Sequence, residues 1–283
     1  MSNALEDRGH DLRDPLWTAR LLRDAPEEIR AVHRAYFAAG ACVATTASYQ
    51  ASVAGFTAAG LDRAEAERLI GRSVTLAREA RDEMTDHGTP RWVAASIGPY
   101  GAVLADGSEY RGHYDVSTAT LRDFHRSRVE LLAAADPDFF AVETIPDMAE
   151  AEVLVDALEK LRLPAWFSYS VDGPHTRAGQ PLADSFDVVA GNNAVFAAGV
   201  NCCRPADVVP ALRIATARTG KVAVAYPNSG EIWQRESRRW QGAPAYDAGR
   251  AVERVADGAA YVGGCCRVGP ADIAALAAAV TGC

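Results

Sequence analysis

The stretch Val195–Tyr226, VFAAGVNCCRPADVVPALRIATARTGKVAVAY, contains the unit that decides the fold. A continuous apolar run over Val195–Cys202 predicts a strand that is buried on both faces. Pro205 suits the first turn of a helix, and the helical pattern continues to Arg218. A second apolar run follows over Lys221–Tyr226. This order predicts two parallel strands of one sheet joined by a helical crossover.

The same alternation extends over the whole chain. The predicted strands are Ala41–Thr46, Trp92–Ile97, Phe139–Thr144, Ala165–Ser170, Val195–Cys202, Lys221–Tyr226 and Ala259–Gly264. The predicted helices are Pro26–Ala39, Asp62–His87, Ser117–Ala134, Asp147–Lys160, Leu182–Gly191, Pro205–Arg218, Tyr246–Asp257 and Pro270–Val280. This inventory predicts an α/β fold, a (β/α)8 TIM barrel whose first strand is missing at the N-terminus. No linker, low-complexity tract or internal repeat divides the chain, so we expect one domain over residues 1–283.

Charge and hydropathy narrow the classes of partner. The chain has 29 Lys and Arg against 37 Asp and Glu, a formal net charge of −8, which disfavours a nucleic-acid-binding surface. No apolar run reaches the roughly 18 residues that a membrane span needs, and the first residues carry charges rather than a signal sequence. We therefore expect a cytoplasmic protein with neither membrane nor nucleic-acid partners. In that reducing compartment its six cysteines do not indicate a disulfide framework.

Four cysteines lie where strands end. Cys202 and Cys203 end one predicted strand, and Cys265 and Cys266 follow Gly-Gly at the end of another. In a parallel barrel the carboxyl ends of the strands meet on one face, where active sites are built. Three thiolates there suit Zn²⁺, because catalytic zinc commonly has three protein ligands and one exchangeable position.

Packing is the alternative explanation for a cysteine, since a lone thiol is usually a small buried hydrophobe. We assign Cys42, Cys203 and Cys283 to this group, and Cys203 also remains the alternative to Cys202 as a metal ligand. Motifs that other cysteine chemistries require are absent from the sequence. A zinc deaminase would need His-x-Glu with Pro-Cys-x-x-Cys, and a thioredoxin-like site would need Cys-x-x-Cys. Neither a Gly-x-Gly-x-x-Gly turn nor a Walker-type Gly-Lys-Ser/Thr supports nucleotide binding.

The strand-end motifs resemble those of a known family. Gly-Val-Asn-Cys at 199–202 and Gly-Gly-Cys-Cys-Arg at 263–267 are similar to the zinc motifs of homocysteine S-methyltransferases. Further similar segments are ASIGPYG at 95–101, ETIP at 143–146, YPNSGE at 226–231 and TASYQAS at 46–52. The resemblance implies a barrel that holds one zinc through Cys202, Cys265 and Cys266. It also implies methyl transfer from S-methylmethionine or S-adenosylmethionine to homocysteine, which forms methionine.

Substrate contacts are expected at the same face. Glu143 ends a predicted strand, and we expect it to hold the α-amino group of the substrate. The connection Pro227–Pro244 shows neither a helix nor a strand pattern, and a long irregular connection is usually functional. The predicted substrate-binding residues are Glu143, Asn201, Tyr226, Asn228, Ser229 and Gly264.

Aromatic rings are candidates for contacts with a sulfonium donor, because they attract cations. The candidates are Tyr49, Tyr100, Tyr226, Trp233 and Trp240, and packing or lid roles are the alternative for each. No histidine lies at a strand end, although His113 is expected near the mouth of the site.

The chain departs from the family pattern at its start. Family members open with a strand that ends in Asp-Gly-Gly, just before the segment that residues 1–9 resemble, and this strand and its substrate-binding aspartate are absent. We expect the natural protein to extend upstream of Met1. The alternatives left open are a selenocysteine or betaine-type methyltransferase and a catalytically weak zinc-binding barrel. The oligomeric state is also left open.

Overall fold

The computed structural model describes residues 1–85, 88–162, 164–234, 239–256 and 258–281. Within these ranges no helix combines the length and the apolar character that crossing a membrane requires.

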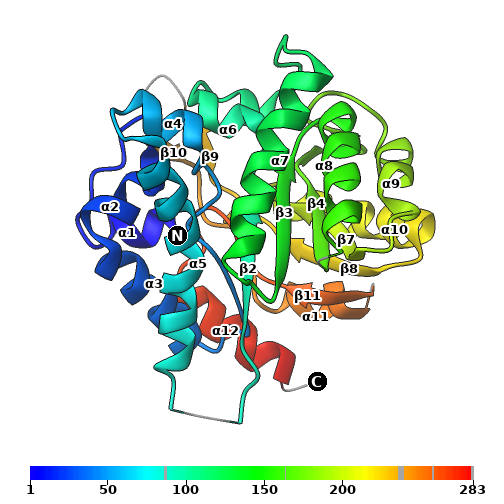
Figure 1. Cartoon of the computed structure of the whole chain (residues 1–283). Helices are drawn as coiled ribbons and strands as arrows, with labels where there is room; N and C mark the ends of the chain where they lie inside the picture. The colour runs from blue at the N-terminus through cyan, green and yellow to red at the C-terminus, as the bar shows by residue number, and fades with distance from the viewer. Residues whose placement is uncertain (86–87, 163, 235–238, 257, 282–283) are drawn as a thin grey trace.

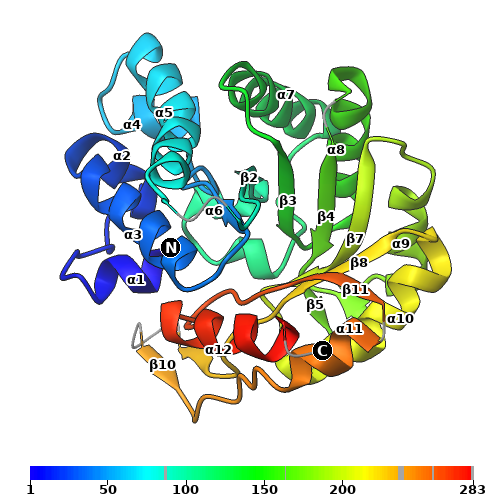
Figure 2. The same ribbon diagram turned by 90° about the horizontal axis from the view of Figure 1, so that it is seen from below.

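A curled sheet of seven parallel strands forms the centre of the molecule (Figures 1 and 2). Its order is β1-β2-β3-β4-β7-β8-β11, and each neighbouring pair is parallel. The bounds are β1 Val43–Thr45, β2 Trp92–Ile97, β3 Phe139–Ile145, β4 Ala165–Tyr169, β7 Val195–Asn201, β8 Val222–Tyr226 and β11 Ala259–Val262. All seven predicted strands are confirmed. The five inner strands are buried over nearly their whole length, which gives a clear apolar signal in the sequence, whereas the edge strands β1 and β11 are partly exposed.

Helices surround the outer face of this sheet (Figure 2). They are α3 Pro26–Ala38, α5 Arg63–Asp82, α7 Thr118–Ala134, α8 Met148–Leu161, α9 Leu182–Ala190, α10 Val208–Thr219, α11 Arg250–Ala256 and α12 Pro270–Thr281. Successive helices contact one another from α3 through α5, α7, α8 and α9 to α10. Helix α11 contacts α12. Helix α12 in turn contacts α3, which comes first in the chain among these outer helices. The outer helices therefore bring the two ends of the curled sheet towards each other.

The sheet has two edges in the described part of the chain, β1 and β11. The predicted α/β class and the parallel curled sheet are thus confirmed. An eighth strand between these edges stays a prediction.

Local signals set the helix starts. The Asp62 side chain accepts a hydrogen bond from the backbone N–H of Glu65 at 2.8 Å, and Asp147 accepts one from Ala149 at 2.9 Å, so both act as N-caps. The prediction Asp62–His87 was too long, since α5 ends at Asp82 and residues 86–87 lie outside the described ranges. The helix predicted from Tyr246 begins only at Arg250, and its predicted last residue, 257, lies outside the described ranges.

Short elements were missed. Residues 227–244 were predicted to lack regular structure, but β9 Ile232–Gln234 pairs antiparallel with β10 Arg239–Gln241. A second small hairpin follows β4, where β5 Val171–Asp172 pairs with β6 His175–Thr176. Strands of two or three residues are too short for a period-2 pattern to show in the sequence.

Candidate active site

Three cysteine sulfurs converge at the carboxyl edge of the sheet. The Sγ atoms of Cys202, Cys265 and Cys266 all lie within 4.8 Å of one another. Cys202 and Cys265 are joined as a disulfide with a Cα–Cα distance of 5.6 Å, and the Sγ atoms of Cys202 and Cys266 are 3.9 Å apart. Cys202 and Cys265 are 63 positions apart in the sequence, and they meet at this face as predicted.

Backbone contacts hold the two cysteine segments together. The N–H of Cys202 donates to the carbonyl of Tyr226 at 3.2 Å, and the N–H of Cys265 donates to that of Pro227 at 2.8 Å. The side-chain oxygen of Asn228 accepts from the N–H of Cys266 at 3.3 Å. The segment after β8 therefore lies between the two cysteine segments and fixes their relative position.

Gly264 permits the turn that brings Cys265 and Cys266 to the same target. A Cβ added to Gly264 would lie 2.1 Å from a side-chain carbon of Val268, so a side chain does not fit there. Burial raises the pKa of the Cys266 thiol above its ordinary value. A cation bound at the three sulfurs would favour the thiolate over the thiol.

The other described cysteines lie elsewhere. Cys203 is completely buried in the main hydrophobic core, and burial raises its pKa to about 12. Cys42 is exposed and precedes β1, at the opposite end of that strand from the carboxyl face; it lines the same large cavity as the three cysteines but is not part of their cluster. Cys283 lies outside the described residues.

Glu143 lies on β3 and lines a large cavity together with the three clustered cysteines. The Ser96 hydroxyl donates a hydrogen bond to its carboxylate, which also hydrogen-bonds Tyr226. Burial raises the pKa of Glu143, and these two hydrogen bonds oppose that shift. The indole N–H of Trp166 donates to the Tyr226 hydroxyl at 3.0 Å, so the tyrosine is held in place.

A cavity of about 1780 Å³ contains most of the predicted site residues. Its walls include the three cysteines together with Glu143, Tyr226, Asn228 and Gly264. It continues between the edge strands β1 and β11, where Val43 and Val262 line it.

Two predicted contact residues, Asn201 and Ser229, do not line this cavity. Asn201 is fully buried and hydrogen-bonds Thr144. The Ser229 hydroxyl donates to Glu231 at 2.9 Å. Both residues therefore position their neighbours in this structure.

The aromatic candidates separate into three groups. Tyr49 and Tyr226 line the cavity. Tyr100 packs against the rings of Tyr114 and Phe124 instead, with centroid distances of 5.5 and 4.9 Å. The side chains of Trp233 and Trp240 are not among those that the structure describes. His113 was predicted near the mouth of the site, but it does not line the large cavity. It also does not line a smaller cavity that shares Tyr110, Asp172 and Arg177 with the large one. Its side chain contacts Asp147 and Ala178.

Tyr110 and Arg177 were not predicted from the sequence. The Tyr110 hydroxyl hydrogen-bonds the Cys266 sulfur, and Arg177 lies 5.9 Å from the Tyr110 ring centroid. Both side chains come from loops or short elements rather than from strand ends, so the strand-end rule could not find them.

The comparison with known families decides the family. The model of the homocysteine S-methyltransferase family matches residues 1–280. The chain belongs to this family. The predicted homocysteine S-methyltransferase family, and with it the methyltransferase class, is confirmed.

Individual homocysteine S-methyltransferases are similar in sequence to this protein over nearly its full length. The enzyme of Escherichia coli strain K12 is 46% identical, over 98% of this chain and 92% of its own length. The enzyme YbgG of Bacillus subtilis strain 168 is 44% identical, over 98% of this chain and 91% of its own. The crystal structure of the homocysteine methyltransferase MmuM from E. coli in a metallated form has a TM-score of 0.88 at 44% identity, covering 98% of this chain and 93% of that one. An oxidised form of MmuM gives the same TM-score.

Proposed function

We propose that this protein transfers a methyl group from a sulfonium donor to the thiol of L-homocysteine and forms methionine. The observation that carries the proposal is the meeting of Cys202, Cys265 and Cys266 at the carboxyl edge of a parallel sheet, in a chain of this family. The E. coli and B. subtilis relatives are named homocysteine S-methyltransferases, and one MmuM structure is described as metallated.

The residues present fit zinc. Three thiol sulfurs within 4.8 Å of one another match the sulfur-rich sets that Zn²⁺ prefers, and the large cavity leaves room for a further ligand. Cys202, Cys265 and Cys266 would hold the ion once the disulfide between Cys202 and Cys265 is reduced. When bound, zinc supplies the positive charge that lowers the pKa of a substrate thiol. The need for reduced thiols favours the cytoplasm as the compartment.

Glu143 would orient the acceptor. Its carboxylate is held by Ser96 and Tyr226 and faces the cavity that contains the cysteines, so it can accept hydrogen bonds from the homocysteine ammonium. This contact fixes one end of the substrate while its sulfur lies at the cysteine end of the cavity. Positioning of this kind lowers the barrier because the reacting atoms are already aligned.

The reaction is a displacement at carbon. The homocysteine sulfur forms the new bond to the methyl carbon, the carbon–sulfur bond of the donor breaks, and its electron pair stays on the donor sulfur. The donor leaves as a neutral thioether, and the thiol proton leaves to solvent. Tyr49, Tyr110 and Tyr226 provide ring surfaces in this cavity that favour a sulfonium cation. With S-methylmethionine as donor, both products are methionine.

We also propose that an eighth strand completes the (β/α)8 barrel between β1 and β11. Both edges face the large cavity, and α12 already contacts α3 outside them. Adding a strand segment that pairs with both edges is expected to raise the stability and the activity of the chain. Unchanged stability and activity would contradict this proposal.

Zinc content and methionine formation test the function together. We expect about one zinc per reduced chain, with turnover from homocysteine and S-methylmethionine. Cys265→Ser and Cys266→Ser should lose zinc and at least about a hundredfold of activity, whereas Cys42→Ser, which changes a cavity thiol outside the three-sulfur cluster, should retain the zinc and most of the activity. Zinc-free protein with full activity would overturn the mechanism. Selenocysteine as acceptor and betaine as donor, assayed in parallel, test the alternatives.

A further inference from the structure

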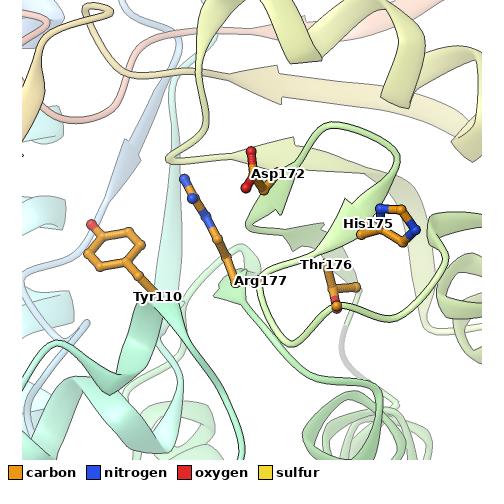
Figure 3. A pocket seen from close by; sticks show the side chains of 6 residues that line it. Tyr110, Asp172, His175, Thr176 and Arg177 are labelled. Atoms are coloured by element: carbon orange, nitrogen blue, oxygen red, sulfur yellow. The ribbon is translucent and has the colours of Figure 1, made fainter.

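A small cavity beside the three-cysteine site has walls with both signs of charge. Its volume is about 330 Å³. The residues that line it are Tyr110, Asp172, His175, Thr176, Arg177 and Gly179 (Figure 3). Three of them, Tyr110, Asp172 and Arg177, also line the large cavity that contains the cysteines. A ligand seated on these three residues therefore reaches the catalytic cavity.

Arg177 places a guanidinium group at this junction, and within the described ranges no carboxylate pairs with it. It follows β6, where its backbone N–H donates to Ser170 at 3.1 Å, and its side chain is half-buried. Its side-chain Nε donates to the Ser170 hydroxyl at 3.5 Å. Among the described residues no carboxylate lies within ion-pair distance of Arg177. A half-buried arginine of this kind is suited to an anionic ligand such as a carboxylate.

Asp172 supplies the opposite charge. Its Oδ1 accepts a hydrogen bond from Arg204 at 2.7 Å, and its side chain is 62% exposed, so the carboxylate still faces solvent and the cavity. Figure 3 shows the Arg177 side chain extending between Tyr110 and Asp172, while His175 points away from it. An anion site and a cation site thus lie within one small cavity.

Tyr110 connects this pair to the reaction centre. Its hydroxyl hydrogen-bonds the Cys266 sulfur, and the Arg177 guanidinium carbon lies 5.9 Å from its ring centroid. A ligand that extends from Arg177 to the cysteine sulfurs along this line therefore contacts the Tyr110 ring. Aromatic rings attract cations, so a sulfonium group on this path is favoured.

We propose that Arg177 and Asp172 form the subsite for the amino-acid head of the methyl donor, and this assignment rests on the proposed methyl transfer. Arg177 binds the α-carboxylate of a sulfonium amino acid, Asp172 binds its α-ammonium group, and Tyr110 contacts the chain that carries the sulfonium. The acceptor has its own anchor in Glu143, which lines only the large cavity. Sulfonium donors without a carboxylate are therefore poor substrates.

Calorimetric binding and steady-state kinetics with S-methyl-L-methionine test the assignment. Arg177→Gln is expected to weaken donor binding and to raise the donor KM about tenfold or more, while the homocysteine KM stays unchanged. Arg177→Lys should recover part of the loss, because it keeps the positive charge. Arg218→Gln removes an exposed arginine of α10 that pairs with Asp187, and it should behave as the unmodified protein.

A second donor distinguishes the loss of the carboxylate contact from a general loss of donor binding. The amide of S-methyl-L-methionine lacks the negative charge, so the unmodified protein should bind it weakly and Arg177→Gln should weaken it no further. An unchanged donor KM in Arg177→Gln, an equal loss with both donors, or a loss in the homocysteine KM would overturn the assignment. If Arg177→Gln does not fold, Arg177→Lys and the amide donor still decide. Absence of turnover in the unmodified protein would contradict the proposed function and not the assignment of Arg177. In that case calorimetric binding of S-methyl-L-methionine still tests the role of Arg177.

Discussion

Asn201 and Thr144 exchange two hydrogen bonds at the carboxyl ends of β7 and β3. The Asn201 side-chain oxygen accepts from the Thr144 N–H at 2.7 Å, and its amide nitrogen donates to the Thr144 hydroxyl at 2.8 Å. Thr144 and Cys202 both have positive φ, 62° and 47°, which costs free energy in residues with a Cβ. One buried amide therefore links the segment that carries Glu143 to the segment that carries Cys202.

Replacing Asn201 tests this link. Asn201→Ala leaves the buried Thr144 N–H without a partner, so we expect the free energy of unfolding to fall by about 2 kcal/mol. The kcat/KM for homocysteine should fall about tenfold or more, because both segments lose their fixed geometry. Denaturant unfolding and steady-state kinetics measure the two effects. Asn193→Ala, at an exposed asparagine, is the control, and equal behaviour of both variants would argue against the link.

Glu143 should set the acid limb of the pH profile. Its carboxylate must be ionised to hold an ammonium group, and burial raises its pKa. The kcat/KM for homocysteine should therefore fall as the pH decreases through this raised pKa, above the value of about 4.3 for an ordinary glutamate. Glu143→Gln should lower kcat/KM and remove this limb. Glu152→Gln, at an exposed glutamate, should keep it, and an unchanged limb in Glu143→Gln would exclude Glu143 as its source.

Arg128 is expected to stabilise the loop that carries Tyr49. It is buried on α7 and donates to the carbonyls of Ser48, Tyr49, Ala51 and Gly98 at 2.8 to 3.1 Å. Arg128→Met leaves these oxygens without their donor, so the free energy of unfolding should fall by more than about 3 kcal/mol.

Arg126→Met is the matched control for Arg128. Arg126 lies on the same helix but is exposed and pairs with Asp123, so its loss should change stability by less than about 0.5 kcal/mol. Thermal and denaturant unfolding compare the two variants. A similar small effect in both would show that the four carbonyl contacts contribute little.

Reduction of the Cys202–Cys265 disulfide should be required for metal binding. The disulfide engages two of the three sulfurs of the cluster, so the oxidised protein should hold almost no zinc and form almost no methionine. Treatment with a dithiol reductant followed by zinc should restore both. Metal analysis, with mass spectrometry to verify the oxidation state, measures this. Stoichiometric zinc in protein whose disulfide is intact would contradict the assignment of the ligands.

The sequence was most informative where strands end. Cys202 and Glu143 follow long apolar runs, so the amino-acid sequence alone predicts that they share one face of the sheet. The direction of each side chain could not be predicted in this way. Asn201 was predicted to contact the substrate. In the structure the oxygen and the nitrogen of its side-chain amide both hydrogen-bond Thr144, a residue with a positive φ.

Residues outside the strands were harder to predict. Arg128 resembles any charged residue on an amphipathic helix, and only the packed loops around it show that it is buried. Tyr110 and Arg177 come from a short 3-10 helix and from the residue after a two-residue strand, and neither element has a sequence period. Their approach to Cys266 depends on how the loops pack.

X-ray absorption at the zinc edge of the reduced, zinc-loaded protein identifies the metal ligands. We expect three sulfur ligands at about 2.3 Å, supplied by Cys202, Cys265 and Cys266, and a fourth sulfur when L-homocysteine is added. A zinc environment that is unchanged by homocysteine, or one dominated by nitrogen and oxygen, would contradict this expectation.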